Sequence, residues 1–116
     1  MLIDMLILNT MTRFAFKMFL KPGFESEYER RHAKLWPELR KQLADAGVTN
    51  YSIFWDKDTN ILFGYQEVAD GAPNSQDVSA ADEITHRWWD YMADIMEVNP
   101  DNSPVTVPVK EVFHID

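Results

Sequence analysis

The sequence predicts one α+β domain, built from an antiparallel β-sheet with two helices on one of its faces. Apolar side chains alternate along three short segments, which is the periodicity of β-strands, and they recur every three or four positions along two longer segments, which is that of helices. With a further short segment near the end, the predicted elements follow the order β-α-β-β-α-β. A chain of 116 residues with 46% apolar content is long enough for one packed core and too short for two.

The first strand and the first helix are predicted over residues 13–20 and 24–46. The strand reads RFAFKMFL, in which alternation gives one strongly apolar face. Pro37 lies inside the helical segment, and a proline donates no backbone N–H and disfavours helical geometry at the residue before it, Trp36. The helix is therefore expected to kink or restart there, with Pro37 in the first turn of its second half, and to end before Gly47.

The rest of the chain is predicted to form a hairpin, a helix and a last strand. Residues 50–56 and 61–68 have strand periodicity, and the KDTN between them favours a tight turn. The segment 69–78 is rich in turn-forming residues and is expected to be a loop. Apolar residues at helical spacing predict a helix over 80–97, which NPDNSP ends, and KEVFHI at 110–115 is expected to close the sheet.

This order of elements is that of the ferredoxin-like fold, in which both helices cover one face of the sheet. The first three strands carry apolar or aromatic residues on both sides, and two helices can cover only one side. Because a large apolar sheet face is not stable in water, a second copy is expected to pack sheet to sheet and to enclose a cavity. The predicted assembly is a homodimer, a dimeric α+β barrel.

Composition narrows the range of partners and locations. The net charge is −8, with 19 acidic against 11 basic residues, so phosphate backbones and anionic lipid surfaces are not expected partners. A neutral or cationic small molecule fits this surface better. No uncharged run is long enough to span a bilayer. The chain has no cysteine, which excludes disulfides and a cysteine nucleophile, and the cytoplasm is the expected location.

The first residues of the chain are expected to lie outside the domain. Residues 1–11, MLIDMLILNTM, are interpreted as an N-terminal extension or an alternative start, and residues 12–116 as a single domain. The segment is apolar like a signal peptide, but it has no basic start, carries Asp4 early and lacks a small-residue cleavage pattern. An added edge strand is the other interpretation of this stretch.

His32 is the candidate acid–base group. It follows Tyr28 by four residues, so the two side chains share a helix face just before the break at Trp36 and Pro37. An imidazole, with an ordinary pKa of about 6.5, can both give and take a proton near neutral pH. Tyr28 could orient it. An isolated histidine on a helix is also typical of a plain surface or the edge of a core, and the residues alone leave both interpretations open.

The stretch RWWDYM at 87–92 supplies flat aromatic surface. Trp88 and Trp89 lie about 100° apart on a helix, so Trp88 joins the apolar stripe while Trp89 faces sideways. An indole offers an apolar wall and an N–H, which suits the C–H faces and hydroxyl groups of a sugar, and Tyr51 adds a ring from the sheet. Tryptophans at helical spacing are equally typical of a core.

A metal centre is not expected. His86 and His114 accompany His32, but the sequence contains no H-x-x-x-H pair and no carboxylate at a spacing that would complete a zinc or iron site. Phosphate-binding loops, glycine-rich dinucleotide turns and a nucleophile triad are not visible either.

Four motifs, in their order and spacing, closely resemble the L-rhamnose mutarotase family. They are EYERRHAKLWPEL, NYSIFWDKDTNILF, RWWDYM, and NPDNSP followed by EVF, and the similarity runs from about Arg13 to Ile115. The resemblance implies a dimeric ferredoxin-like fold, no cofactor, and an isomerase that interconverts the α and β anomers of L-rhamnose. It implies that His32 is the proton donor. The sugar-binding residues that it implies are Tyr28, Tyr51, Trp88 and Trp89.

The sequence departs from the family pattern in its leading ten residues and in a loop around 71–78 that looks longer than usual. That loop precedes the second helix and could reshape the entrance of the pocket. A mutarotase for another deoxy sugar, such as fucose, is the nearest alternative function. A cofactor-free monooxygenase or haem-degrading enzyme on the same dimeric fold and a non-catalytic sugar-binding dimer are further alternatives, because a fold alone carries little functional weight.

Overall fold

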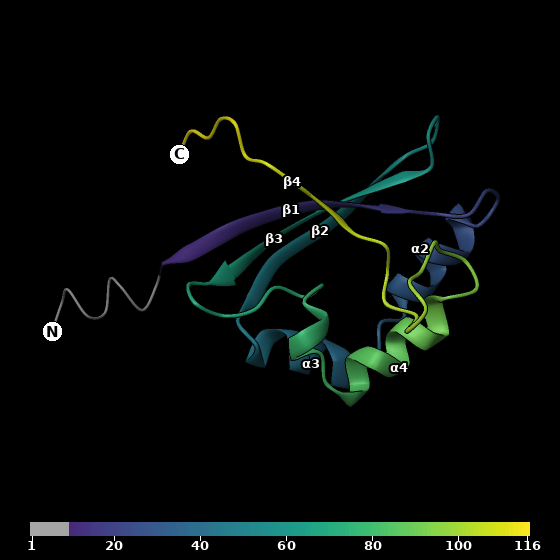
Figure 1. The fold of residues 1–116 in the computed structure, drawn as a ribbon, viewed down its shortest axis with the longest axis horizontal. Helices are drawn as coiled ribbons and strands as arrows, with labels where there is room; N and C mark the ends of the chain where they lie inside the picture. Colours follow the sequence, from purple (N-terminus) through teal and green to yellow (C-terminus); the bar gives the residue numbers. More distant parts are fainter. Residues whose placement is uncertain (1–9) are drawn as a thin grey trace, which may run out of the picture.

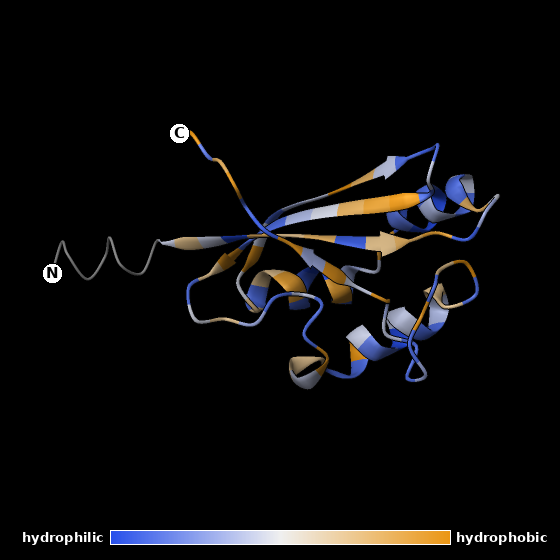
Figure 2. Ribbon diagram, turned by 45° about the horizontal axis from the view of Figure 1, so that its top comes forward, coloured by the Kyte–Doolittle hydropathy of each residue, from blue (hydrophilic) through white to orange (hydrophobic). Residues whose placement is uncertain are grey.

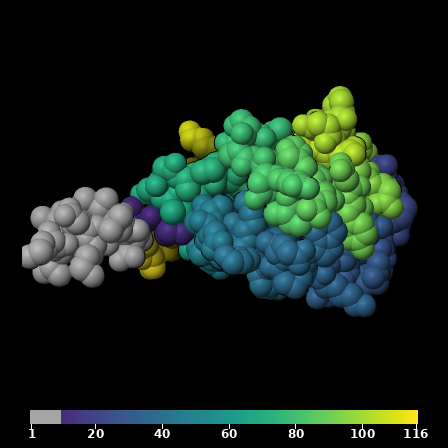
Figure 3. All heavy atoms as spheres, turned by 90° about the horizontal axis from the view of Figure 1, so that it is seen from below, coloured from purple at the N-terminus to yellow at the C-terminus, as the bar shows by residue number. Residues whose placement is uncertain are grey.

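The computed structural model describes residues 10–116, which fold as a four-stranded antiparallel sheet with three α-helices on one side of it (Figure 1). The elements in chain order are β1 (Met11–Phe19), α2 (Glu25–Ala33), α3 (Pro37–Asp45), β2 (Val48–Asp56), β3 (Ile61–Ala69), the 3₁₀ turn η1 (Val78–Ala80), α4 (Glu83–Met92) and β4 (Val107–Val109). The view from the helix side shows α3 and α4 in contact with each other (Figure 3).

The strands lie in the order β2-β3-β1-β4, and β3 runs antiparallel to both β1 and β2. β1 and β2 are therefore parallel to each other with β3 between them, which is the ferredoxin-like arrangement. The prediction of an α+β fold of this class is confirmed, with the first helix present as α2 and α3. The interpretation of residues 1–11 as an extension falls mostly on residues 1–9, outside the described residues, and the boundary at residue 12 stays a prediction.

The first helical segment is interrupted where the sequence predicts it. α2 ends at Ala33, and Pro37 is the first residue of α3. A backbone N–H at this position would form no hydrogen bond within the helix, so a proline fits there. Trp36 before it is extended, with φ −60° and ψ 130°. α3 ends as predicted before Gly47, which takes a φ of +88°, a conformation that glycine adopts without a side-chain clash.

The second helix is shorter than the predicted range 80–97. α4 begins only after Asp82, whose carboxylate accepts the N–H of Thr85 at 3.0 Å and so caps the helix. After α4 the backbone bonds to the end of β1 instead of continuing the helix. The N–H of Lys21 donates to the carbonyl of Ile95 at 2.9 Å. The apolar periodicity continues beyond the helix because these residues still face the core.

The prediction of a last strand over 110–115 is wrong. The NPDNSP turn closes tightly, because the N–H of Asn99 donates to the carbonyl of Ser103 at 2.8 Å. The chain therefore reaches the sheet early, and β4 pairs with β1 with Val109 opposite Ala15. Residues after Val109 form no strand, although β-branched and aromatic residues such as Val112, Phe113 and Ile115 are typical of one.

The core lies between the inner face of the sheet and the helices. Its most deeply buried apolar side chains are Phe16, Leu62, Met92 and Ile95. Figure 2 shows apolar residues along the strands and polar residues at the chain turns. Gly64 in β3 lies opposite Phe16, and a Cβ at this position would overlap the Phe16 ring. The glycine therefore makes room for Phe16, a large and fully buried side chain at the centre of the sheet.

A buried arginine joins α2 to the end of α4. The Arg31 side chain is 9% exposed, and its guanidinium donates to both carboxylate oxygens of Asp94 at 2.9 and 3.2 Å and to the backbone carbonyl of Tyr91 at 2.7 Å. It also pairs with Glu27 at 2.7 Å and lies 4.5 Å above the Tyr91 ring. Hydrogen bonds from Arg30 and Arg31 lower the pKa of Glu27 to about 2. The helix that carries His32 is thus fixed to the helix that carries Trp88.

Arg31→Lys is expected to lower the free energy of unfolding by about 1–2 kcal/mol, because an ammonium group cannot reach all these acceptors from one position. Urea denaturation measures the effect. The matched control is Arg30→Lys, because Arg30 is exposed and its replacement is expected to change the stability clearly less than that of Arg31. Equal losses in the two variants would contradict the role given to Arg31.

Candidate functional site

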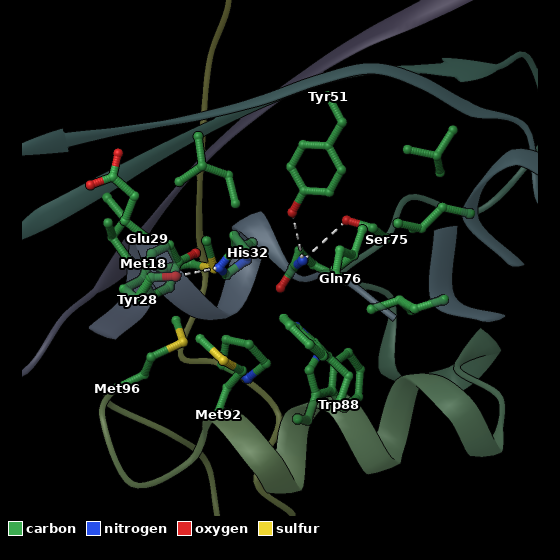
Figure 4. A pocket seen from close by; sticks show the side chains of 18 of the residues that line it. Met18, Tyr28, Glu29, His32, Tyr51, Ser75, Gln76, Trp88, Met92 and Met96 are labelled. Atoms are coloured by element: carbon green, nitrogen blue, oxygen red, sulfur yellow. Dashed lines mark hydrogen bonds between the residues drawn. The ribbon is translucent and has the colours of Figure 1, made fainter. Parts of the chain in front are cut away.

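A cleft of about 1130 Å³ lies between the inner face of the sheet and the three α-helices (Figure 4). All five residues singled out from the sequence line it: Tyr28, His32, Tyr51, Trp88 and Trp89. A cavity had been expected between two packed sheets, but this cleft is formed within one chain, on the helix side. The break between α2 and α3 lies beside it, as the sequence predicts.

The His32 ring is held by its own helix. Its Nδ1 lies 2.9 Å from the backbone carbonyl oxygen of Tyr28, and the two rings stack with centroids 4.2 Å apart. A carbonyl oxygen can only accept, so Nδ1 carries the hydrogen and the neutral ring keeps a lone pair on Nε2. Burial lowers the pKa of His32 below its usual 6.5, against the effect of the Tyr28 carbonyl. The ring is therefore neutral at pH 7, with Nε2 as a proton acceptor.

Trp88 forms the wall beside the imidazole. The edge of one ring meets the face of the other, with centroids 5.4 Å apart and planes at 88°. On its other side Trp88 contacts Trp36 in the same way, at 5.0 Å, and Trp36 stacks on Tyr91 at 5.6 Å. The tryptophan at the helix break therefore supports the tryptophan of the cleft.

Trp89 belongs to the core as much as to the cleft. Its side chain is buried in the cluster that fills the centre of the domain, and its ring meets that of His86 at 5.2 Å. Trp88 is buried in the same cluster. Trp88 and Trp89 are thus both core residues and cleft-lining residues, because the cleft borders the core. Their positions fit either interpretation of the pair.

Tyr51 enters the cleft from β2, opposite the helices. Burial raises the pKa of Tyr51, while the Ser75 and Gln76 side chains act against this effect. Burial also raises the pKa of Tyr28 well above its usual value, and Tyr51 adds to it. Both phenols therefore keep their hydrogens near neutral pH and can bind oxygen atoms of a ligand.

Sequence reasoning missed the polar residues of the loop after β3. Ser75 and Gln76 line the cleft, and the fully buried Gln66 in β3 binds Ser75. In the sequence, the first two look like ordinary turn formers. A detectable signal was Gln66, a polar residue on the apolar face of a strand, which must find a hydrogen-bonding partner when buried.

The other two histidines lie elsewhere. His86 packs on Trp89, and His114 lies in the exposed segment after β4, with Nε2 2.9 Å from Asp116, so it does not end a strand as expected. Within residues 10–116 no three His, Cys, Asp or Glu side chains gather closely enough to hold a metal ion. In the same range no helix is long and apolar enough to cross a bilayer.

The cleft combines aromatic and thioether walls with a few polar groups. Met18, Met92 and Met96 lie on the His32 side, and Tyr51 faces them with the loop amide of Gln76 (Figure 4). Apolar walls with a small number of oriented donors and acceptors suit an uncharged, hydroxyl-bearing ring. One neutral imidazole beside such a ring can move a proton to and from it.

Comparison with known proteins agrees with this chemistry. A family model described as L-rhamnose mutarotase matches residues 13–115. The L-rhamnose mutarotase of Phocaeicola vulgatus is 68% identical over 106 residues, which cover 91% of this chain and 100% of that protein. The one of Bacteroides thetaiotaomicron is 62% identical with the same coverage.

A solved structure gives the same result for the fold. The crystal structure of L-rhamnose mutarotase from Formosa agariphila matches with a TM-score of 0.82 and 50% sequence identity, covering 90% of this chain and 99% of that one. Sequence and fold therefore agree over nearly the whole chain, and the protein belongs to the L-rhamnose mutarotase family.

Proposed function

We propose that this protein is an isomerase that interconverts the α and β anomers of L-rhamnose by acid–base ring opening and closure at His32. Membership of the family and 68% identity to an L-rhamnose mutarotase support the substrate. The observation that supports the mechanism is a neutral imidazole, fixed by the Tyr28 carbonyl, beside the Trp88 wall of a cleft.

In the proposed reaction, His32 Nε2 first takes the proton of the anomeric hydroxyl. The proton-donor role that the family resemblance implies then belongs to its imidazolium, in ring closure. The C1–O bond of the ring breaks, a carbonyl forms at C1, and the ring oxygen gains a proton from a second donor, for which the phenol of Tyr28 is a candidate. The open aldehyde turns about its C1–C2 bond, and closure on the other face reverses the transfers, with the imidazolium returning its proton. A positioned acid–base group contributes roughly 10²–10⁴-fold, which is about 3–5 kcal/mol.

The binding residues have separate parts in this proposal. Trp88 and Trp89 give apolar surface that accepts the C–H face and the 6-methyl group of a deoxy sugar, where a buried hydroxyl would need a partner. Tyr28 and Tyr51 bind sugar oxygens. A mutarotase for another deoxy sugar such as fucose remains the nearest alternative, and faster anomer exchange with L-fucose than with L-rhamnose would favour it.

His32→Ala is expected to lower enzyme-catalysed anomer exchange by roughly 10²–10⁴-fold, because the proton acceptor is lost. Saturation-transfer NMR between the two anomer signals of L-rhamnose measures the rate. His114→Ala is the matched control and should exchange like the wild type, since His114 lies in an exposed segment away from the cleft. Equal exchange in wild type and His32→Ala would remove His32 from the mechanism.

The catalysed rate is expected to depend on pH through His32. Because burial lowers the pKa of His32 from 6.5, the neutral ring predominates at pH 7, and the rate should be flat from there upward. As pH falls through the lowered pKa, Nε2 becomes protonated and the rate should fall. The profile is measured after subtraction of spontaneous mutarotation. A catalysed rate that rises on acidification would contradict a base at Nε2.

We also propose that the protein is a homodimer, joined through the outer face of the sheet. The helices cover only the inner face, and on the outer face Phe54 is 63% exposed beside Phe63, which is 39% exposed. Val107 and Val109 of β4 add exposed apolar groups to the same face, on the other side of Ala15 and Lys17 of β1. Exposed apolar groups of this extent are stabilised by a partner, and a second copy is the simplest one.

Phe54→Lys is expected to convert a dimer into a monomer, because it puts a charge into the apolar interface. Size-exclusion chromatography with light scattering gives the mass of each. Phe24→Lys is the control, since Phe24 lies at the start of α2 and is 38% exposed there. A wild type that is monomeric at micromolar concentration would refute the dimer. The absence of a cofactor and a cytoplasmic location stay predictions.

A further inference from the structure

The loop between β3 and η1 is fixed by a buried amide. Gln66 has no exposed surface; its Oε1 accepts the backbone N–H of Ser75 at 2.8 Å, and its Nε2 donates to the Ser75 hydroxyl oxygen at 2.7 Å. A backbone N–H can only donate, so this pair of bonds fixes which way the Gln66 amide faces. Ser75 is therefore held at one place and in one orientation at the edge of the cleft.

The next residue, Gln76, links this loop to Tyr51. Its Nε2 donates to the Ser75 hydroxyl oxygen at 3.1 Å and to the phenol oxygen of Tyr51 at 3.5 Å (Figure 4). Its Oε1 lies 3.3 Å from the hydroxyl of Thr106, whose single hydrogen is shared with the backbone carbonyl of Pro104 at 3.1 Å. The carbonyl end of the amide thus faces Thr106, while the NH₂ end faces the cleft and Tyr51.

This arrangement decides what Tyr51 offers to a ligand. A phenol oxygen that accepts a hydrogen bond from the protein keeps its own O–H to donate elsewhere. The Ser75 and Gln76 side chains lower the pKa of Tyr51 against the effect of burial, as groups that donate to a phenol oxygen do. A donor that is already oriented costs less entropy on binding than one that rotates freely.

We propose that Gln76 and Ser75 are positioning residues that direct the Tyr51 hydroxyl to donate a hydrogen bond to an oxygen of the bound sugar, and that Gln66 holds them in place. This inference rests on the proposed function and specifies how the same site binds its substrate. The ligand group it requires is an acceptor oxygen, either a ring oxygen or a hydroxyl, at the Tyr51 end of the cleft. The residues concerned lie in and beside the loop between β3 and η1.

Gln76→Glu tests the direction of the hydrogen bond without changing the shape of the side chain. A carboxylate cannot donate, so it would accept the Tyr51 hydrogen and turn that hydroxyl away from the sugar. The KM for L-rhamnose is expected to rise about tenfold, the usual effect of one lost hydrogen bond, with kcat within about twofold of the wild type. Unchanged or tighter binding would mean that the amide already accepts from Tyr51, and would overturn the proposal.

Two further variants test whether the effect of Gln76→Glu comes from the hydrogen bond to Tyr51. One controls for the added negative charge, and the other for effects that do not involve Tyr51. Gln42→Glu adds the same charge on α3, outside the cleft lining, and should leave KM within twofold. In a Tyr51→Phe background, Gln76→Glu should add nothing to the effect of Tyr51→Phe alone, because its action passes through the lost hydroxyl. Additive effects would show that Gln76 acts independently of Tyr51 and would also overturn the proposal.

A measurement without sugar separates this proposal from the proposed function. In protein labelled with ¹³C at the tyrosine Cζ atoms, the Tyr51 signal is assigned by its loss in Tyr51→Phe. That signal should move in Gln76→Glu and stay in place in Gln42→Glu; an unmoved signal overturns the orientation of the hydroxyl. If the wild type neither binds nor interconverts L-rhamnose, the proposed function fails, and the labelled signal alone decides the hydrogen bond.

Discussion

The geometry of the cleft depends on one buried guanidinium. Arg31 joins α2 to the turn after α4, and its neighbour His32 points away from that junction by the 100° that separates successive helical residues. Fixing the arginine therefore fixes the imidazole as well. The Arg31 interaction therefore also sets how far His32 lies from Trp88, with ring centroids 5.4 Å apart. A buried charge of this kind is stable because all its strong donors have acceptors.

Packing and recognition use the same side chains here. Trp88 is buried in the core cluster and also makes T-shaped contacts with the imidazole of His32 and with Trp36. A domain of this size has a small core, so a cleft large enough for a sugar must be cut into its edge. The polar groups are kept few and each is oriented by a neighbour, as the Tyr28 carbonyl orients His32. The contacts that pack the domain therefore also orient the polar groups of the cleft.

The sequence was most informative where local chemistry decides the structure. Pro37 predicts the helix restart, and Gly47 predicts where α3 ends, because both effects act within a few residues. The strand expected at 110–115 failed because pairing is set by the preceding turn, which no alternation reveals. Which face of the sheet borders the cleft also depends on tertiary packing, which a linear pattern does not show. The polar loop of Gln76 could not be assigned, since turn formers and ligands look alike in a sequence.

The interruption at Trp36 and Pro37 has a consequence for how the domain assembles. It leaves α2 and α3 with nine residues each, and α4 has ten, all shorter than the roughly 12–15 residues below which isolated helices are marginal in water. These short helices are therefore expected to become stable only when they pack against the sheet. Helical content, the aromatic cluster and the cleft should therefore appear together in a single cooperative step, with no early helical species in which the cleft exists on its own.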